Sequence, residues 1–585
     1  MYRLFRAPLL TILLLLACAS GVSAAPGALD TSFGIGGFAT APINTTYPGS
    51  VAYDIALSPT GQIVAAASRN DGGVYRVMVQ RFNADGSTDT SFGDGGLATA
   101  EIPTGFAINV VAGVGVQPDG SVVVGARVYP TPATTPGVFA VIRFTPSGQL
   151  DTGFDGDSAG NGILMLTVGP PGPPNPSEVL RDLIVEPSGK IVMAGDSEYS
   201  GHANLSVGRL NPDGTWDTSF SGDGKFSQVF TTTDLDFWSI ADVPGDGGYA
   251  IGGRLLPGSG PTITQPTVVR IKEDGTLDTS FTGGVGNLSP TPGVVTYLWS
   301  TDNTRLGEIK AVVADPAGGF IAGGYQNAPL PNPGYYGLAR YTATGALDPS
   351  FGSGGLKIDR IGGGGSAIYD LAVQPNGKIL AGMSGVDSNT GFVGRFNSDG
   401  SPDTSFGNDG VVDPAAYAAD RIALQPDGKL VVSVRRTGQT ETTLMRLLTA
   451  DDPISTLPVL TPTVKISTPA KKSLKTSKLK AISGTAGPAG SIAKVEIALQ
   501  RKDSKLLKKH KKCAWLSSSK AKFKNSSAKK GKCRSPRYLK VAGSTSWKYK
   551  LKKTLPVGSY ALTARVTLTS GAIATKTYSF KLTKK

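Results

Sequence analysis

The feature that most constrains the fold of this chain is an internal repeat with a mean period of about 62 residues. The string LDTSFGIGG begins at Leu29, and six later strings keep its Asp-x-x-Phe core. Self-similarity at a fixed period predicts a repeat architecture, in which each unit buries its apolar surface against its neighbours. The aspartates that mark the seven copies are Asp30, Asp89, Asp151, Asp217, Asp278, Asp348 and Asp403.

A second element alternates with the first and consists of two apolar runs around a Pro-Gly turn. IALSPTGQIVAAA at Ile55 is the first of seven examples, and IALQPDGKLVVSV at Ile422 is the last. Short β-rich runs on both sides of a tight glycine turn predict a β-hairpin. A third element is an arginine eight residues before the aspartate, as Arg81 stands before Asp89.

Each unit therefore predicts four short antiparallel strands, and the seven units predict an all-β, seven-bladed β-propeller over residues 25–450. The two ends of this region complement each other. Arg446 in the last unit has no aspartate after it, whereas the N-terminus has Asp30 and a strand at 38–43 without a preceding hairpin. We expect the N- and C-terminal strands to close the ring, because closure removes unpaired edges. An open array is the alternative.

These repeats resemble the delta-60 repeat proteins, secreted bacterial proteins in which a QPDGK hairpin alternates with a DGxLDTSFGxxG turn. The resemblance covers residues 27–450 and implies a β-propeller, but it implies no common activity. The hairpin VPGDGG and Gly153, which replaces the usual serine, depart from the pattern. Only the turns of those two blades are put in doubt.

We interpret the repeated aspartate and arginine as structural. The aspartate would cap its own turn, the phenylalanine would anchor that turn in the core, and the constant spacing predicts an Arg–Asp contact inside each blade. A calcium loop fits poorly, because the full spacing and terminal glutamate of an EF-hand loop are missing. The predicted pairs include Arg81 with Asp89, Arg143 with Asp151, and Arg446 with Asp30 across the two ends.

Charge divides the chain into two opposite parts. Residues 453–585 contain 32 Lys and Arg but two acids, a net charge of +30, whereas residues 25–452 have a net charge of −18. Residues 451–462 form a Pro-containing linker, and alternating runs beyond it predict a small β-sandwich at 463–585 that resembles bacterial Ig-like domains. We expect this domain to bind anionic cell-wall or extracellular polysaccharide, or the acidic propeller itself. Nucleic acid is not expected, because aromatic residues are few.

Residues 1–24 indicate a secretory signal, in which two arginines precede an apolar run and a small-residue cleavage site. We expect a secreted or cell-surface bacterial protein without a transmembrane segment; lipid attachment at Cys18 is the alternative. In an oxidising compartment, Cys513 and Cys533 are expected to form a disulfide bond.

The composition limits the chemistry that the chain can perform. Two histidines in 585 residues argue against His-based metal sites and Ser-His catalysis, and no HExxH or GxSxG motif occurs. The predicted function is a non-enzymatic binding scaffold, monomeric and without a cofactor. The alternative is a secreted carbohydrate-active enzyme, a glycosidase or lyase with a propeller catalytic domain, because such an enzyme needs only two or three acids or a Tyr/Arg pair.

The first strand of each unit is expected to line the central channel, beginning at the face where loop length varies. Three units carry an aspartate five residues before the hairpin proline, and one carries an arginine. Close carboxylates repel each other unless water, an arginine or a cation separates them, so calcium is a possible ligand and a solvated acidic channel is the alternative. The candidate binding residues at this level are Asp54, Asp182, Asp370 and Arg421.

Overall fold

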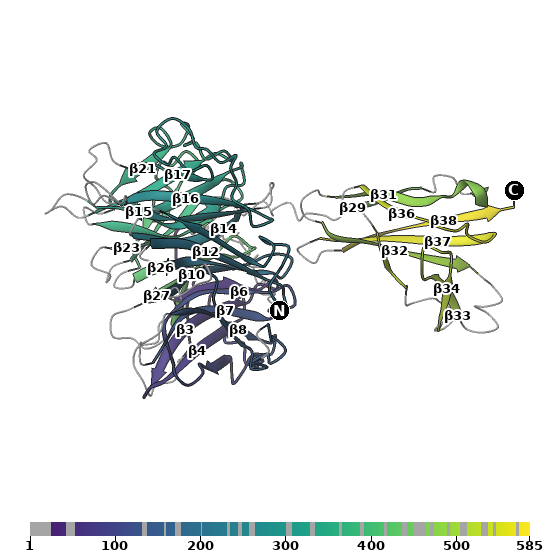
Figure 1. The fold of residues 1–585 in the computed structure, drawn as a ribbon, viewed down its shortest axis with the longest axis horizontal. Helices are drawn as coiled ribbons and strands as arrows, with labels where there is room; N and C mark the ends of the chain where they lie inside the picture. The colour runs from purple at the N-terminus through teal and green to yellow at the C-terminus, as the bar shows by residue number, and fades with distance from the viewer. Residues whose placement is uncertain are drawn as a thin grey trace, which may run out of the picture.

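The computed structural model is all-β, and its strands form two groups of sheets, β1–β28 and β29–β38 (Figure 1). A short 3-10 turn, η1 (Thr476–Lys478), is the helical element of the described part. Within that part, no helix is long and apolar enough to cross a membrane. The structure describes residues 25–584 except 42–52, 132–136, 157–158, 170–176, 200–201, 231–233, 244–247, 257–263, 300–306, 328–333, 362–364, 386–390, 415–417, 436–441, 450–462, 469–472, 488–491, 503–511, 528–535, 542–545 and 569–572.

Five of the repeat units fold into four-stranded antiparallel sheets whose strands follow one another in sequence order. The inner strands are almost continuously apolar, because neighbouring sheets cover both of their faces. These sheets comprise β2 (Asp54–Leu57), β3 (Ile63–Asp71), β4 (Val74–Phe82) and β5 (Leu97–Glu101); β6 (Phe106–Val116), β7 (Val122–Pro130), β8 (Val138–Phe144) and β9 (Ile163–Leu166); β10 (Ser177–Val185), β11 (Ile191–Tyr199), β12 (His202–Leu210) and β13 (Lys225–Val229); β14 (Asp234–Val243), β15 (Gly248–Leu256), β16 (Gln265–Lys272) and β17 (Val294–Thr296); and β18 (Gly307–Ala314), β19 (Phe320–Gln326), β20 (Tyr335–Tyr341) and β21 (Leu356–Asp359).

The remaining strands of the repeat region belong to one eight-stranded sheet that includes both of its ends. Within it, β23 and β26 share a single residue pair, Met383 with Ala419, so the sheet consists of two four-stranded parts. The N-terminal strand pairs with the last one, from Phe38 opposite Met445 to Ala41 opposite Thr442. The strands are β22 (Ser366–Val373), β23 (Ile379–Gly385), β24 (Gly391–Phe396), β25 (Val411–Val412), β26 (Ala418–Leu424), β27 (Leu430–Arg435), β28 (Thr442–Leu447) and β1 (Phe38–Ala41).

Neighbouring sheets pack face to face through small and branched apolar side chains. One core cluster, for example, joins Val64, Val79 and Val124 of two successive units. Glycine permits the closest approach: a Cβ added to Gly125 on β7 would lie 2.4 Å from Cδ2 of Leu183 on β10. The first strand of each unit therefore lies directly on the second strand of the unit before it.

The repeated arginine contributes to both its own sheet and the next one. Nε of Arg81 donates to Oδ2 of Asp89 at 2.8 Å, and the guanidinium carbon lies 4.3 Å from the centre of the Phe92 ring. Nη1 of Arg81 also donates to the carbonyl of Pro146, in the turn of the following unit, at 2.8 Å. One side chain thus holds its own turn, covers the core phenylalanine and binds the adjacent sheet.

The same arrangement recurs with small variations. Nη2 of Arg143 lies 2.7 Å from Oδ2 of Asp151. Arg340 departs from the pattern, since its Nε lies 2.6 Å from Asp315 and 3.8 Å from Asp348. The structure also brings together the two ends of the repeat region, because Nε of Arg446 donates to Oδ2 of Asp30, 416 positions away, at 2.9 Å.

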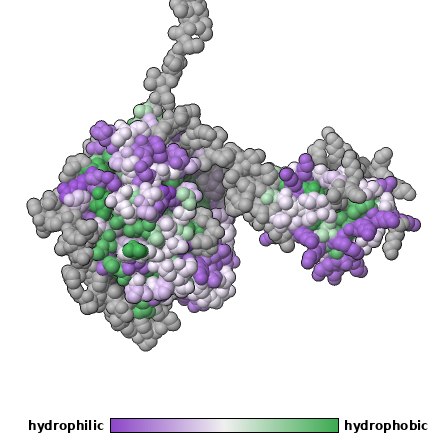
Figure 2. All heavy atoms as spheres, turned by 90° about the horizontal axis from the view of Figure 1, so that it is seen from above, coloured by the Kyte–Doolittle hydropathy of each residue, from purple (hydrophilic) through white to green (hydrophobic). Residues whose placement is uncertain are grey.

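The C-terminal strands form two sheets around one apolar core that includes Trp547, Tyr560 and Leu499. Hydrophilic residues gather on the surface of this part (Figure 2). The smaller sheet contains β29 (Thr463–Thr468), β31 (Ala481–Gly487) and β36 (Ser546–Lys550), and the larger contains β30 (Ser473–Lys475), β38 (Ile573–Thr583), β37 (Gly558–Leu568), β32 (Ile492–Lys502), β33 (Lys512–Leu516), β34 (Phe523–Ser527) and β35 (Leu539–Lys540).

Several expectations fall outside the described residues. Cys513 is buried in β33, but Cys533 is not described, so the disulfide bond stays a prediction. The same holds for the signal at 1–24, for lipid attachment at Cys18 and for the linker at 451–462.

Candidate functional site

The first strands of all seven units line one small central cavity of about 60 Å³. It has room for water but not for a sugar ring or a peptide. The four residues that the sequence predicts at one level of the channel all contribute to the wall of this cavity. They are Asp54 on β2, Asp182 on β10, Asp370 on β22 and Arg421 on β26.

Each of the three aspartates is bound to the backbone of the following sheet. Oδ2 of Asp54 accepts a hydrogen bond from the Val114 amide at 2.8 Å. Asp182 accepts from the Ile240 amide at 2.9 Å, and Asp370 accepts from the Ile422 amide at 2.8 Å. These carboxylates therefore join neighbouring sheets at the channel wall.

Arg421 completes this ring of contacts. Its guanidinium donates to the carbonyls of Tyr53 at 3.0 Å and Tyr369 at 2.8 Å, and it lies 3.8 Å from Oδ1 of Asp54. Burial raises the pKa of Asp182 and Asp370 to about 7, although Arg421 opposes this shift in both. The described residues contain no group of three His, Cys, Asp or Glu that could hold a metal ion, so calcium binding stays a prediction.

The sequence pattern does not predict that a second set of side chains lines the cavity. That prediction assumed strict alternation along the first strands, which the structure does not show. A β-bulge interrupts the pairing between Leu180 and Asp182, and equivalent bulges occur in β14, β18, β22 and β26. A bulge adds one residue, so two consecutive side chains point the same way. Arg181 and Asp182 therefore both line the cavity, as do Trp238 and Ser239.

The bulge residues and their neighbours build a polar network at the end of the channel where the first strands begin. Arg181 binds Asp196 through two hydrogen bonds of 3.0 Å, and it also contacts Asp236. Nη2 of Arg254 lies 2.5 Å from the other oxygen of Asp236. We call this group the mouth cluster; its members are Arg181, Asp196, Asp236, Trp238, Arg254, Glu308, Lys310 and Tyr325.

Trp238 lies at the centre of the mouth cluster. Its ring is 4.1 Å from the guanidinium carbon of Arg181 and 3.4 Å from Nζ of Lys310, which come from the two neighbouring units. Lys310 also contacts Glu308, and Nη1 of Arg254 lies 3.2 Å from that carboxylate. Cations on an aromatic ring are favourable when both are shielded from water. The cluster is therefore held rigidly.

The pKa values of the cluster are displaced in several directions. Burial raises the pKa of Asp196 to about 6, against the opposing effect of Arg181. Burial lowers the pKa of Lys310, although the charge of Glu308 acts the other way. Burial and the Glu308 carboxylate, to which Tyr325 donates a hydrogen bond, raise the pKa of Tyr325. Perturbed values gathered in a concave site are typical of functional centres.

Arg127 stands beside the mouth cluster and differs from its arginines. It occupies the same place on β7 that Asp196, Arg254 and Tyr325 occupy on the second strands of the next three units. Its side chain is partly exposed, and the Asp196 and Asp236 carboxylates of the mouth cluster act favourably on its charge. Burial and the positive charge of Arg181 lower the pKa of Arg127.

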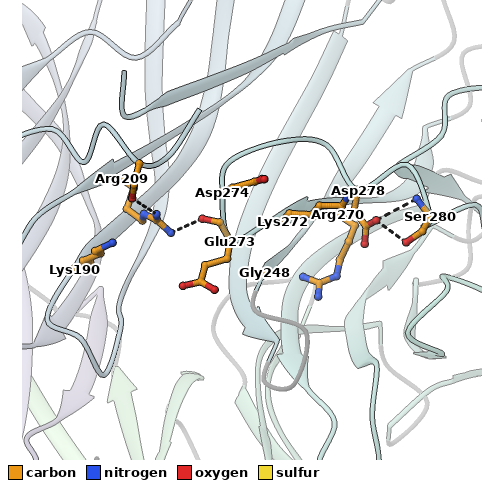
Figure 3. A pocket seen from close by; sticks show the side chains of 10 residues that line it. Lys190, Arg209, Gly248, Arg270, Lys272, Glu273, Asp274, Asp278 and Ser280 are labelled. Carbon is orange, nitrogen blue, oxygen red and sulfur yellow. Dashed lines mark hydrogen bonds between the residues drawn. The ribbon is translucent and has the colours of Figure 1, made fainter. Parts of the chain in front are cut away.

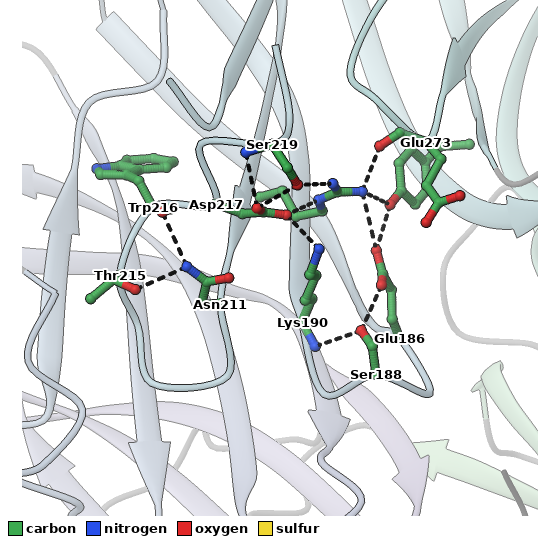
Figure 4. A network of polar contacts seen from close by, with 11 residues as sticks. Glu186, Ser188, Lys190, Asn211, Thr215, Trp216, Asp217, Ser219 and Glu273 are labelled. Atoms are coloured by element: carbon green, nitrogen blue, oxygen red, sulfur yellow. Dashed lines mark hydrogen bonds and ion pairs between the residues drawn. The ribbon is translucent and has the colours of Figure 1, made fainter. Parts of the chain in front are cut away.

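A larger hollow of about 540 Å³ lies at the opposite face, among the Pro-Gly and LDTSF turns (Figure 3). Lys190 fills the equivalent space in the preceding unit by contacting Asp217 at 2.7 Å, whereas that position is Gly248 here. Figure 4 shows the surroundings of Lys190 in the preceding unit, where the Asp217 carboxylate faces this lysine. The same carboxylate oxygen lies 2.7 Å from Nε of Arg209.

Comparison with known proteins agrees with the repeat architecture. A family model described as a domain of unknown function with a β-propeller matches residues 58–92, 117–154, 186–220, 260–281 and 374–406, less than a third of the chain. No curated protein matches.

The chain is similar to several solved structures at low identity. The polysaccharide lyase Uly1 is 11% identical over 71% of this chain and 93% of its own, with a TM-score of 0.41. An α-L-arabinanase from Penicillium chrysogenum, solved with arabinobiose, is 13% identical over 59% of this chain and 95% of its own, with a TM-score of 0.36. Such values concern the fold and decide neither reaction nor substrate.

The prediction of a protein without enzymatic activity is not supported by this comparison, which finds a polysaccharide lyase and an arabinanase among the similar structures. The five family matches, together with the four-stranded sheets of five units, support a β-propeller repeat protein.

Proposed function

We propose that this protein is a secreted carbohydrate-active enzyme that cleaves a polysaccharide at the channel mouth. The single observation that carries the proposal is the mouth cluster, where proton-transferring groups and fixed charges converge beside loops. Loops on a rigid scaffold are the usual place for binding residues. The central cavity is too small for a sugar, so the substrate would lie across the mouth rather than enter the channel.

Lys310 and Tyr325 are the candidate proton-transfer groups. Both contact the Glu308 carboxylate, which is 3% exposed and fixes their positions. Burial lowers the pKa of Lys310, which is the direction that a general base requires, although the charge of Glu308 opposes this shift. The Tyr325 hydroxyl keeps its proton and suits the role of an acid.

Hydrolysis by a pair of carboxylates has less support. Such enzymes need two carboxyl groups that reach the scissile bond from opposite sides. In the mouth cluster, Asp196, Asp236 and Glu308 are each bound to arginine or lysine. The aspartates of the channel wall are bound to backbone amides.

The proposal is tested by release of new sugar ends from a panel of neutral and acidic polysaccharides. Lys310→Met should reduce the rate by roughly a hundredfold or more, as loss of a general base does. Lys310→Arg keeps the charge but should not restore activity. Lys357→Met is the matched control, because Lys357 pairs with Asp359 in β21, where Asp359 is largely exposed. Absence of cleavage on every polysaccharide would refute the proposal.

A second role, attachment to anionic polymer, is favoured by the C-terminal strands. Lys465 on β29 and Lys548 and Lys550 on β36 are exposed on the outer face of the smaller sheet. Glu496, the acid described in this part, is bound to Arg565 at 2.6 Å on the larger sheet. An unneutralised lysine face suits a polyanion.

We also propose the finer architecture on which these roles depend: seven blades, closed into a ring where β1 pairs with β28. The wall of the central cavity supports this, because all seven first strands contribute to it. For residues 463–585 we propose an Ig-like sandwich, supported by two sheets around one core.

A further inference from the structure

A groove of about 450 Å³ lies between the sheet of β18–β21 and the next sheet, of β22–β25. Its apolar lining includes Phe392 and Phe396 on β24 and Ile361, which follows β21. Phe396 is buried in the core between the two sheets, whereas Phe392 and Ile361 are partly buried and pack against that core. Unlike the central cavity, this groove has the size of a site for a small ligand.

Phe392 distinguishes this groove from the other repeats. It stands three residues before the repeated arginine, Arg395, and its side chain remains partly exposed. The repeat architecture does not require an aromatic ring there, and aromatic side chains at an accessible apolar surface commonly contact ligands. The six other units carry Met78, Ala140, Ser206, Thr267, Gly337 and Thr443 at the equivalent position.

Arg360 supplies a donor to the groove. Its guanidinium carbon lies 4.1 Å from the centre of the Tyr335 ring. Its Nε is buried and forms no hydrogen bond with any residue that the structure describes. A buried donor without an acceptor is unfavourable, so this guanidinium would be stabilised by a ligand that brings an acceptor.

The other polar groups of the groove limit the charge of that ligand. Asn408 and Asp409 are exposed in the turn before β25, and Asp413 follows that strand. Asp359 also lines the groove, and it pairs at 2.8 Å with Lys357, which does not. The carboxylates disfavour an anion and the guanidinium disfavours a cation. A neutral sugar suits this surface, because its C–H groups form an apolar face and its hydroxyls both donate and accept hydrogen bonds.

One row of paired residues connects the groove to the mouth cluster. Glu308 pairs with Tyr325, Tyr325 with Tyr336, and Tyr336 with Asp359 across the four strands β18–β21. Neighbouring strands are about 4.8 Å apart, so the row spans roughly 14 Å. Glu308 and Tyr325 belong to the mouth cluster, whereas Tyr336 and Asp359 line the groove. The groove is therefore within reach of a polysaccharide that lies across the mouth.

We propose that the groove lined by Phe392 and Arg360 is a subsite for a neutral sugar residue of the polysaccharide, a few residues away from the bond that is cleaved. This inference rests on the proposed function and names part of its substrate. Phe392 packs against the apolar face of the sugar ring, Arg360 donates to an oxygen of the sugar, and Asp409 accepts from a hydroxyl. The subsite binds and positions the chain and takes no part in cleavage.

The test uses the full chain and neutral hexasaccharides of glucose, mannose, galactose and xylose, with binding measured by calorimetry. Phe392→Ser, which gives the groove the residue type found at Ser206, should weaken binding by roughly tenfold or more. Arg360→Met removes the buried donor and should weaken binding by about tenfold. Ile35→Ser is the control, since Ile35 is 90% exposed and does not line the groove. Melting temperatures show whether each variant is folded.

The outcomes separate the subsite from the proposed function. Weaker hexasaccharide binding in both groove variants, with the control unchanged, supports the subsite. On a polysaccharide that is cleaved, the same variants should raise KM by about tenfold and leave kcat within about twofold. An unchanged KM, or hexasaccharide binding that neither variant alters, overturns the subsite but keeps the enzyme.

Binding that depends on Phe392, without cleavage of any polysaccharide, keeps the subsite and overturns the proposed enzyme. If no hexasaccharide binds and no polysaccharide is cleaved, both proposals fail.

Discussion

Replacing Arg446 with methionine removes a buried guanidinium that joins the two ends of the repeat region. The side chains of Arg446 and Asp30 are 6% and 8% exposed, and the arginine also donates to the Ala84 carbonyl at 2.6 Å. Removing one partner of a buried pair costs about 3–5 kcal/mol. Lys429, 3.1 Å from Asp30, still neutralises the carboxylate, so we expect the lower end of that range, about 3 kcal/mol.

The assay is thermal unfolding of the full chain. For a repeat region of roughly 400 residues, the unfolding entropy is about 0.8 kcal/mol/K, so a loss of about 3 kcal/mol lowers the melting temperature by about 4 °C. Arg81→Met, which breaks the equivalent pair inside the chain, should cause a similar fall. Arg76→Met should change stability by less than about 1 kcal/mol, because that pair is exposed.

Comparing the melting temperatures of Arg446→Met and Arg81→Met shows whether the contact between the two ends of the repeat region stabilises the protein as much as a contact between successive units. If Arg446→Met melts at the wild-type temperature while Arg81→Met does not, the contact across the ends carries no stability. The reasoning on closure would then be refuted.

Three further predictions follow from the channel wall, the N-terminal strand and the lysine face. Because burial raises the pKa of Asp182 and Asp370 to about 7, the folded chain holds more protons than the unfolded chain below that value, and stability should fall as pH rises from about 4 to 7. Asp182→Asn with Asp370→Asn should flatten the dependence of melting temperature on pH, and an unchanged profile would contradict this assignment. Deleting residues 27–43 removes β1 and Asp30 and should destabilise the repeat region more than Arg446→Met does; equal melting temperatures would show that β1 adds nothing. The full chain should be retained on acidic polysaccharide at low salt and released as screening increases, and Lys548→Glu with Lys550→Glu should weaken retention; salt-independent retention would count against an electrostatic contact.

Much of the frame could be predicted from local sequence. A Pro-Gly turn between two apolar runs specifies a hairpin wherever it occurs, and the spacing from Arg81 to Asp89 is constant because both lie in one unit. The four-stranded sheets follow from these local rules. What the spacing did not reveal is that the arginine also binds the next sheet, because Pro146 belongs to another repeat.

The candidate site was predicted only in part. Counting back from the hairpin proline found Asp182 and Asp370, which line the channel, but their carboxylates bind backbone amides of the next sheet. The mouth cluster takes Arg181, Trp238 and Lys310 from one residue earlier, Asp236 and Glu308 from three residues earlier, and its other members from the second strands. Strict alternation would turn Arg181 and Trp238 away from the channel, and the β-bulge reverses this.

The repeating unit, the opposite charges of the two parts and the residues that pair within a unit can all be read from local sequence, because each depends on neighbours along the chain. The contacts between polar side chains of different units depend instead on how the sheets pack. Arg181, Trp238 and Lys310 each stand six residues before the hairpin proline of three successive units, but nothing in this spacing indicates that these three different side chains contact one another. They converge because the first strands lie around one narrow cavity, where residues some sixty positions apart become neighbours.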